Sequence, residues 1–326
     1  MRKIGFVPLL CLPAFAAFNG TVMNRTTGHP LPGATVTLYG FGQGGMEPVD
    51  HNTTDAQGKF VINREVSGGP AMLRVEVDDV NYNHMIRPGM PTTNVTLDVY
   101  NASKHPGAAK VSKHMILFQP SGGQMVVTET FLVENPGKTT WNNPAEGTLH
   151  FYLPKAANGA LDAKANAPDG LPVPAPTAAT SRADVYAVKF EVKPGETRFD
   201  LSYTVPYTEG QPYEGKVVSQ DDNTYLIAPN GVTMQADGVS DLGEEPRSQA
   251  HIYGLKTNSY KVELTGAVAA APAASDSGDQ ADSGPQIEEI MPRVYDQAKL
   301  ILGLALGILA LGFALLYRAK ENNHVK

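Results

Sequence analysis

The feature that most constrains the fold is a series of short runs in which apolar and polar residues alternate, separated by Gly, Pro, Asn and Asp. In residues 35–39, 73–77 and 94–99 every second side chain is apolar. A period of two places these side chains on one face of a β-strand, whereas a helix needs a period of 3.6 residues. Almost no segment between the two ends of the chain shows the helical period. The sequence therefore predicts an all-β protein.

The alternating runs fall into two groups, which predicts two β-sandwich domains, at residues 17–103 and 110–265. In the second group, a run ending at Val192 precedes Pro194-Gly195, and a longer run follows that turn. We expect these two runs to form a long hairpin. Residues 156–180 are rich in Ala, Pro, Asn and Asp, which predicts a long surface loop with some polyproline II character. A partner-binding flap is the alternative for this insertion.

Both ends of the chain predict export and membrane anchoring. Residues 1–16 combine two basic residues, an apolar run and the small residues Ala14 and Ala16, which is typical of a secretory signal peptide. Residues 300–317 carry no charge, and as a helix of about 1.5 Å per residue they would cross a bilayer. We expect a single-pass protein of the cell membrane, with its N-terminal part in a bacterial periplasm or at the cell surface.

Three short segments complete the predicted organisation near the membrane. Residues 266–286 contain Ala, Ser, Gly, Pro and Asp without a basic residue, which predicts a disordered acidic linker. Residues 287–299 form a juxtamembrane segment, and residues 318–326 a cytoplasmic tail. In the predicted transmembrane helix, Gly303, Gly307, Ala310 and Ala314 share one face, a spacing that favours close helix packing.

Charge and cysteine content exclude several classes of protein. The chain has 26 Lys and Arg against 33 Asp and Glu, a net charge of -7, so it lacks the basic excess of a nucleic-acid-binding protein. The single cysteine, Cys11, lies in the predicted signal peptide. No two of the eight histidines have the spacing of a local metal site, and no G-x-S-x-G motif is present. We therefore predict no metal, no cofactor and no enzymatic activity.

The most specific motif lies at residues 20–38, GTVMNRTTGHPLPGATVTL, followed by TDAQGKF at residues 54–60. These residues describe a strand, a tight turn at Thr27-Gly28, a strand that follows Gly33, and a hairpin turn between Asp55 and Gly58. The two motifs together resemble the carboxypeptidase regulatory-like domain. The resemblance implies a seven-stranded, transthyretin-like β-sandwich of the CnaB-like and carbohydrate-binding-like group, which acts as an accessory or binding module and carries no catalytic residue.

Three aromatic residues are candidates for ligand contact. Tyr39 and Phe41 lie in a glycine-rich stretch, which predicts a flexible loop. Trp141, the only tryptophan, lies in a polar stretch where it could stack on a sugar ring or a partner, or be buried at the edge of the sandwich.

Together these features favour an exported, membrane-anchored, non-enzymatic protein that presents two β-sandwiches to a polymer or a protein. Carbohydrate is one candidate ligand, on analogy with the fold group alone. The alternative is an accessory subunit of a membrane complex, assembled through the transmembrane helix. A hydrolase in the second domain is a third hypothesis, because a sequence does not reveal which side chains meet in space.

Overall fold

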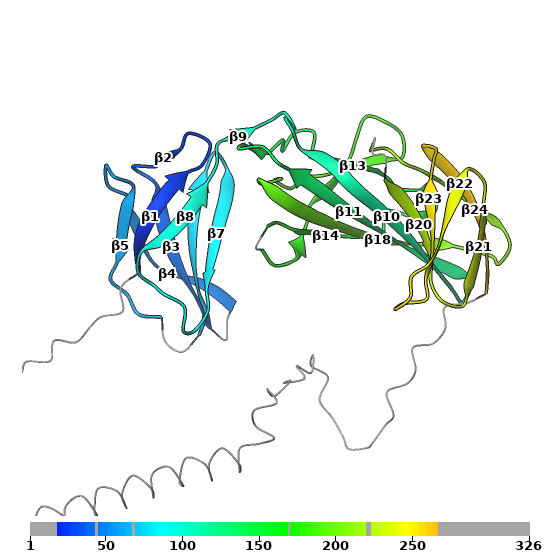
Figure 1. Ribbon diagram of the computed structural model, residues 1–326, viewed down its shortest axis with the longest axis horizontal. Coiled ribbons are helices and arrows are strands. Elements are labelled where there is room, and N and C mark those ends of the chain that lie inside the picture. The colour runs from blue at the N-terminus through cyan, green and yellow to red at the C-terminus, as the bar shows by residue number, and fades with distance from the viewer. Residues whose placement is uncertain (1–17, 43–44, 67–68, 169, 220–222, 267–326) are drawn as a thin grey trace, which may run out of the picture. The chain divides into compact units, whose positions relative to one another are not determined.

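The computed structural model describes residues 18–42, 45–66, 69–168, 170–219 and 223–266 (Figure 1). The predicted signal peptide, juxtamembrane segment, transmembrane helix and tail lie outside these residues, as does the predicted acidic linker except for Gly266, which ends the last strand. Regular structure in the described part is β-strand apart from one 3-10 turn at Lys155–Ala157, which confirms the all-β prediction. None of the helices in this part is long and apolar enough to span a membrane.

The first domain consists of two four-stranded sheets with a shared hydrophobic core. One sheet contains β1 (Phe18–Asn24), β2 (His29–Pro30), β5 (Lys59–Ile62) and β8 (Val95–Val99). The other, in spatial order, contains β4 (Gly45–Thr53), β3 (Thr35–Gly42), β6 (Ala71–Val77) and β7 (Val80–Ile86). Alternate residues of these strands point into the core, as the period of two predicts.

The motif residues of the first domain act as turn and core formers. The Asn24 side chain accepts hydrogen bonds from the backbone N–H groups of Thr26 and Thr27, and so closes the turn after β1. Buried Thr54 donates to the Leu31 carbonyl and accepts from the Ala34 N–H, which ties the two halves of the motif together. Gly58 has a φ of 70°, and a Cβ there would lie 2.7 Å from Pro30 Cβ, so only glycine fits.

The second domain is built on an eight-stranded sheet that shares one hydrophobic core with two three-stranded sheets (Figure 1). In spatial order the large sheet contains β15 (Val173–Pro174), β14 (Leu161–Asn166), β18 (Gly195–Pro206), β11 (Gln124–Asn135), β10 (Lys110–Ser121), β20 (Thr224–Ala228), β23 (His251–Leu255) and β22 (Val239–Glu244). The small sheets contain β13 (Leu149–Tyr152), β17 (Val185–Val188) and β16 (Thr177–Ala179), and β19 (Pro212–Lys216), β24 (Ser259–Gly266) and β21 (Val232–Ala236).

Two short strands join the two groups of sheets along the chain. Strand β9 (Ala102–Ser103) follows the first domain and pairs in parallel with β12 (Thr140–Trp141). Buried Thr140 is also hydrogen-bonded through its hydroxyl to the Tyr82 hydroxyl, at 2.8 Å. Burial raises the pKa of Tyr82 to about 12.

The predicted long hairpin around Pro194-Gly195 is wrong. Strand β18 pairs with β11 along its whole length, from Gly195 opposite Asn135 to Pro206 opposite Gln124, while β17 belongs to a small sheet with β13 and β16. The chain therefore crosses between sheets at this turn. Periodicity reports which face of a strand is buried but not which strand lies beside it, so two runs that are neighbours in sequence need not be neighbours in space.

The prediction of a loop at residues 156–180 is also wrong. This stretch contains β14, which pairs with β18 in the large sheet, and the short strands β15 and β16. Ala163 and Ala165 of β14 point into the core and are 9% and 1% exposed. Their alternation with Asp162, Lys164 and Asn166 is that of a strand, but small alanine side chains give a weak hydrophobic signal.

Candidate functional site

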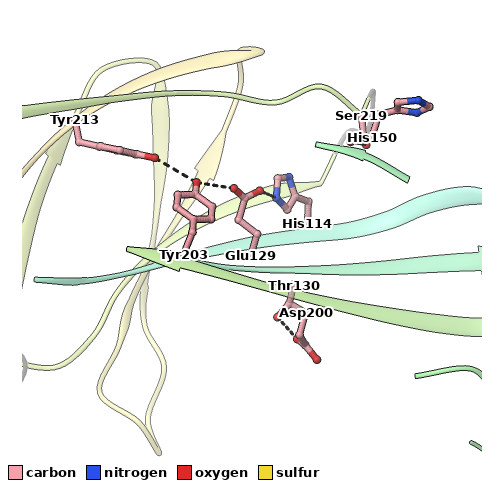
Figure 2. Close-up of polar contacts among 8 residues, drawn as sticks. All are labelled: His114, Glu129, Thr130, His150, Asp200, Tyr203, Tyr213 and Ser219. Carbon is pink, nitrogen blue, oxygen red and sulfur yellow. Dashed lines mark hydrogen bonds and ion pairs between the residues drawn. The ribbon is translucent and has the colours of Figure 1, made fainter. Parts of the chain in front are cut away.

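A line of polar side chains runs through the core of the second domain, on the inward face of the large sheet (Figure 2). His114 on β10, Glu129 on β11 and Tyr203 on β18 occupy positions where the alternation places buried residues. Glu129 lies directly opposite Ile116 and Leu201, so His114 and Tyr203 are its diagonal neighbours on the two adjacent strands. The register of three central strands thus brings the three side chains together.

Both oxygens of the Glu129 carboxylate are occupied. Tyr203 Oη donates to Oε1 at 2.9 Å, and His114 Nε2 lies 2.8 Å from Oε2. Because the only Tyr203 hydroxyl proton points to Glu129, the 3.2 Å contact between Tyr203 Oη and Tyr213 Oη must have Tyr213 as its donor. The result is a continuous line from Tyr213 on β19 to His114 on β10.

The His114 end of this line is closed to solvent. His114 and Glu129 are 1% and 3% exposed, and the imidazole stacks on Phe131 with ring centroids 3.8 Å apart. His114 Nδ1 has no hydrogen-bond partner among the described residues. A buried nitrogen without a partner is costly, so this pair is held in place by the packing around it.

The tyrosines at the other end of the line, Tyr203 and Tyr213, and their neighbour Tyr260 have raised pKa values. Burial, and next the Glu129 carboxylate, raise the pKa of Tyr203 well above its ordinary value. Burial likewise raises the pKa values of Tyr213 and Tyr260. These hydroxyls therefore remain protonated donors over the physiological pH range.

A surface depression of about 560 Å³ lies next to this end of the line. Tyr260, whose ring centroid is 6.4 Å from that of Tyr213, forms part of its wall. Strands β19 and β24 and the turns after β21 and β23 supply the rest, together with Tyr152 at the end of β13. The lining residues are Tyr152, Glu214, Gly215, Lys216, Asp237, Gly238, Thr257, Ser259, Tyr260 and Lys261.

The charged groups of the depression are available for a ligand. Glu214, Lys216, Asp237 and Lys261 are all exposed. None of the four forms an ion pair within 4.0 Å with any residue that the structure describes. The Lys216 ammonium lies 5.6 Å from the centre of the Tyr152 ring, a cation–π distance. Burial, and then Asp184 and Glu214, raise the pKa of Tyr152.

Gly215 gives Tyr260 its position in the wall. The two residues are cross-strand partners in the β19–β24 pair. A Cβ on Gly215 would lie 2.2 Å from the Tyr260 hydroxyl, so the tyrosine ring covers the bare glycine backbone.

Two other polar contacts in Figure 2 differ from this site. Thr130 donates to Asp200 at 2.7 Å on the opposite face of the large sheet, where Asp200 also pairs with Arg198. Ser219 donates to the backbone carbonyl of His150 at 2.9 Å, not to the imidazole. The Ser219 hydroxyl is therefore not oriented as a nucleophile activated by that histidine.

The aromatic candidates from the sequence lie on strands and not in a flexible loop. Tyr39 and Phe41 lie within β3, and the Arg74 guanidinium covers the Tyr39 ring at 4.8 Å. Phe41 is 38% exposed and lies opposite Met46 of β4. Trp141 packs against the core of the second domain, and its indole N–H donates to the Lys104 carbonyl at 3.2 Å. The predicted packing residues Gly303, Gly307, Ala310 and Ala314 lie outside the described residues.

Sequence reasoning missed both the buried line and the depression. A signal for the first was present, because Glu129 and His114 interrupt runs of alternating apolar residues at buried positions. The depression had no signal, since its residues come from strands and turns between Tyr152 and Lys261. In the described part of the chain, no group of three or more His, Cys, Asp or Glu side chains could hold a metal ion.

Comparisons with known proteins do not assign a family. No family model and no curated protein matches the chain. Among solved structures, the M1 zinc metallopeptidase from Deinococcus radiodurans is 12% identical with a TM-score of 0.25, and a mutant of it is 11% identical with a TM-score of 0.27. Each alignment covers 48% of this chain and 42% of the peptidase. At these TM-scores the likeness carries no argument about function.

Proposed function

We propose that this chain is an exported, membrane-anchored, non-enzymatic binding protein, and that the depression of its second domain holds a carbohydrate polymer. The observation that carries the proposal is the set of unpaired charged groups around the depression of about 560 Å³. Exposed polar groups that converge on a concave surface beside aromatic rings are typical of a ligand site. A protein is the alternative ligand in this proposal.

The chemistry of the lining favours a neutral ligand rich in hydroxyl groups. Two lysines face two carboxylates, so the site carries no net charge to select an ion. The Ser259 hydroxyl can both donate and accept, whereas the Thr257 hydroxyl donates to the Ser259 carbonyl and offers an acceptor. Tyr152 and Tyr260 add apolar ring surface beside these polar groups. A sugar ring offers this combination of hydroxyls and C–H surface.

The buried line behind the depression supports a binding role over catalysis. A general base must be able to reach a substrate proton, directly or through one water. Glu129 is 3% exposed and already accepts two hydrogen bonds, and His114 is 1% exposed. The line instead fixes Tyr213, which contacts the Tyr260 wall.

The first domain and the ends of the chain complete the proposal. The motifs at residues 20–38 and 54–60 resemble the carboxypeptidase regulatory-like domain, which implies a second binding module. The apolar segment at residues 300–317 would hold both modules at the membrane.

Polysaccharide binding by the full chain in detergent tests the proposal. Pull-downs with insoluble peptidoglycan, cellulose and chitin would be compared for wild type and for Lys216→Ala/Lys261→Ala. We expect binding to one polymer, weakened about tenfold or more by the double substitution. Lys164→Ala/Lys189→Ala is the control, because it removes the same charge from exposed positions outside the depression.

Each other result contradicts part of the proposal. An equal loss of polysaccharide binding in both double variants would indicate that lysines attract the polymer through their charge alone, wherever they lie on the surface. Loss of binding in Phe41→Ala alone would place the site in the first domain. Binding to none of the polymers would exclude a carbohydrate ligand of these three classes and favour a protein ligand.

The small residues of the apolar C-terminal segment favour one alternative function, an accessory subunit of a membrane complex. Gly303, Gly307, Ala310 and Ala314 would allow close helix packing. Cross-linking in native membranes should then recover a stoichiometric membrane partner that Gly303→Leu/Gly307→Leu loses. Unchanged recovery would reject this alternative.

A further inference from the structure

Six apolar side chains lie together on the outer face of the large sheet in the second domain. They come from its last four strands, β10, β20, β23 and β22, which lie side by side in Figure 1. We name this set the apolar patch: Met115, Leu117, Tyr225, Ile227, Leu242 and Ile252. None of the six belongs to either hydrophobic core that the described residues form.

The strand registers make the patch continuous. Met115 lies opposite Tyr225, and Leu117 lies opposite Ile227, which in turn lies opposite Ile252. Residues directly opposite one another point to the same face, so these five side chains form two adjacent rows. All five alternate with core residues and are partly exposed.

A β-bulge adds the sixth residue. The register of β22 against β23 shifts between Asp241 and Gly243, which leaves Leu242 without a cross-strand partner. Its side chain lies over the outer face of Gly254, where a Cβ would meet Leu242 Cδ1 at 3.5 Å. Leu242 is 56% exposed, so an apolar side chain is held against a sheet and open to solvent.

Apart from Val126 and Leu132 of β11, the rest of this outer face is polar, and its charged residues carry no net charge. Arg198 pairs with Asp200, and Lys164 pairs with Asp162, each within 2.9 Å. By strand alternation, four basic residues share the face with four acidic residues: Lys110, Lys113, Lys164 and Arg198 with Glu134, Asp162, Asp200 and Glu196. The chain as a whole has a net charge of -7.

We propose that this outer face is an interface between two copies of the chain, packed face to face about a two-fold axis. A net negative charge keeps like copies apart, so two copies approach most easily through a neutral face. A two-fold interface brings the same surface of each copy together, so it can cover one apolar patch with the other. Sheets commonly pack in this way, through the apolar side chains of facing strands.

The oligomeric state of the full chain in detergent tests this interface. Native mass spectrometry should show a dimer of the wild type at about 10 μM. Leu242→Asp and Ile227→Asp would each place a carboxylate in the contact and should raise the dimer dissociation constant by about 100-fold. Leu171→Asp is the matched control, because Leu171 is 70% exposed and lies outside the patch. Circular dichroism would confirm that each variant is folded.

Three outcomes would overturn the proposal. The wild type could be monomeric even at about 100 μM. The dimer could persist in both patch variants and disappear in Gly303→Leu/Gly307→Leu, which would place the contact in the apolar C-terminal segment. A monomeric wild type that binds phosphatidylcholine vesicles, with binding lost in Leu242→Asp but not in Leu171→Asp, would identify a lipid surface as the occupant.

Discussion

Glu129 is a carboxylate at a position where strand alternation places an apolar side chain. Two donors, Tyr203 Oη and His114 Nε2, satisfy its two oxygens within a core that water does not reach. Such a buried group is stable only while its partners remain, because each of them would otherwise be left without a hydrogen bond. These two contacts form only in the observed register of β10, β11 and β18, so they favour that register.

Replacing this carboxylate should show how strongly the core depends on it. Glu129→Gln keeps the shape of the side chain but offers one amide nitrogen to a donor, so we expect a loss of about 2 kcal/mol in the free energy of unfolding. Asp200→Asn is the matched control on the outer face, where its carboxylate is 33% exposed. It should cost less than about 1 kcal/mol. Urea unfolding measures both, and equal losses would contradict a special role for Glu129.

At the scale of elements, β14 shows how a weak sequence pattern becomes a strand. Its alanines face the core and its charged residues face outward, because β18 offers it a long paired edge. A segment of this composition would remain a loop without such a neighbour. The apolar patch has a similar origin, since it exists only where the parallel pairing of β10 with β20 aligns their outer faces.

The two faces of β14 should respond differently to the same substitution. Ala165 is 1% exposed, so Ala165→Leu adds volume to a filled core and should destabilise the protein by about 1–3 kcal/mol. Lys164→Leu, on the solvent face, should change the free energy of unfolding by less than about 0.5 kcal/mol. Urea denaturation of both variants checks this. Similar changes in the free energy of unfolding for both variants would mean that β14 does not have one buried and one exposed face.

On the scale of the whole molecule, buried tyrosines link folding to pH. Tyr203, Tyr213 and Tyr260 have pKa values raised by burial, while in the unfolded chain a tyrosine titrates near 10. Above that pH the unfolded state loses these protons and the folded state keeps them. Stability is therefore complete below about pH 10 and falls as the pH rises toward the folded-state pKa values.

Alkaline unfolding should reveal this linkage. Each of the three tyrosines contributes a fall of about 0.7 kcal/mol per pH unit at pH 10, where the unfolded tyrosine is half ionised, and about 1.2 kcal/mol per unit at pH 11, so together they give about 2 rising to about 4 kcal/mol per unit. Tyr213→Phe should reduce the slope by one tyrosine's share. Urea unfolding at intervals between about pH 9 and pH 11 measures the slope. A free energy of unfolding that is constant over this range would show that these hydroxyls ionise equally in both states.

The alternating pattern of the sequence predicted most of the strands and their buried faces, because a period of two is a local property that each strand carries whatever lies beside it. It also predicted the turns of the N-terminal motif, where Gly58 and the Asn24 side chain impose their own geometry.

Which strands are neighbours is visible only in the folded protein. The fold places β18 beside β11 and not beside β17, and the contact of Glu129 with Tyr203 follows from that pairing. The depression depends on the pairing of β19 with β24, and the apolar patch on the pairing of β20 with β10 and β23. Each of these features joins residues that are far apart along the chain, and alternation within a strand carries no information about the strand that lies opposite.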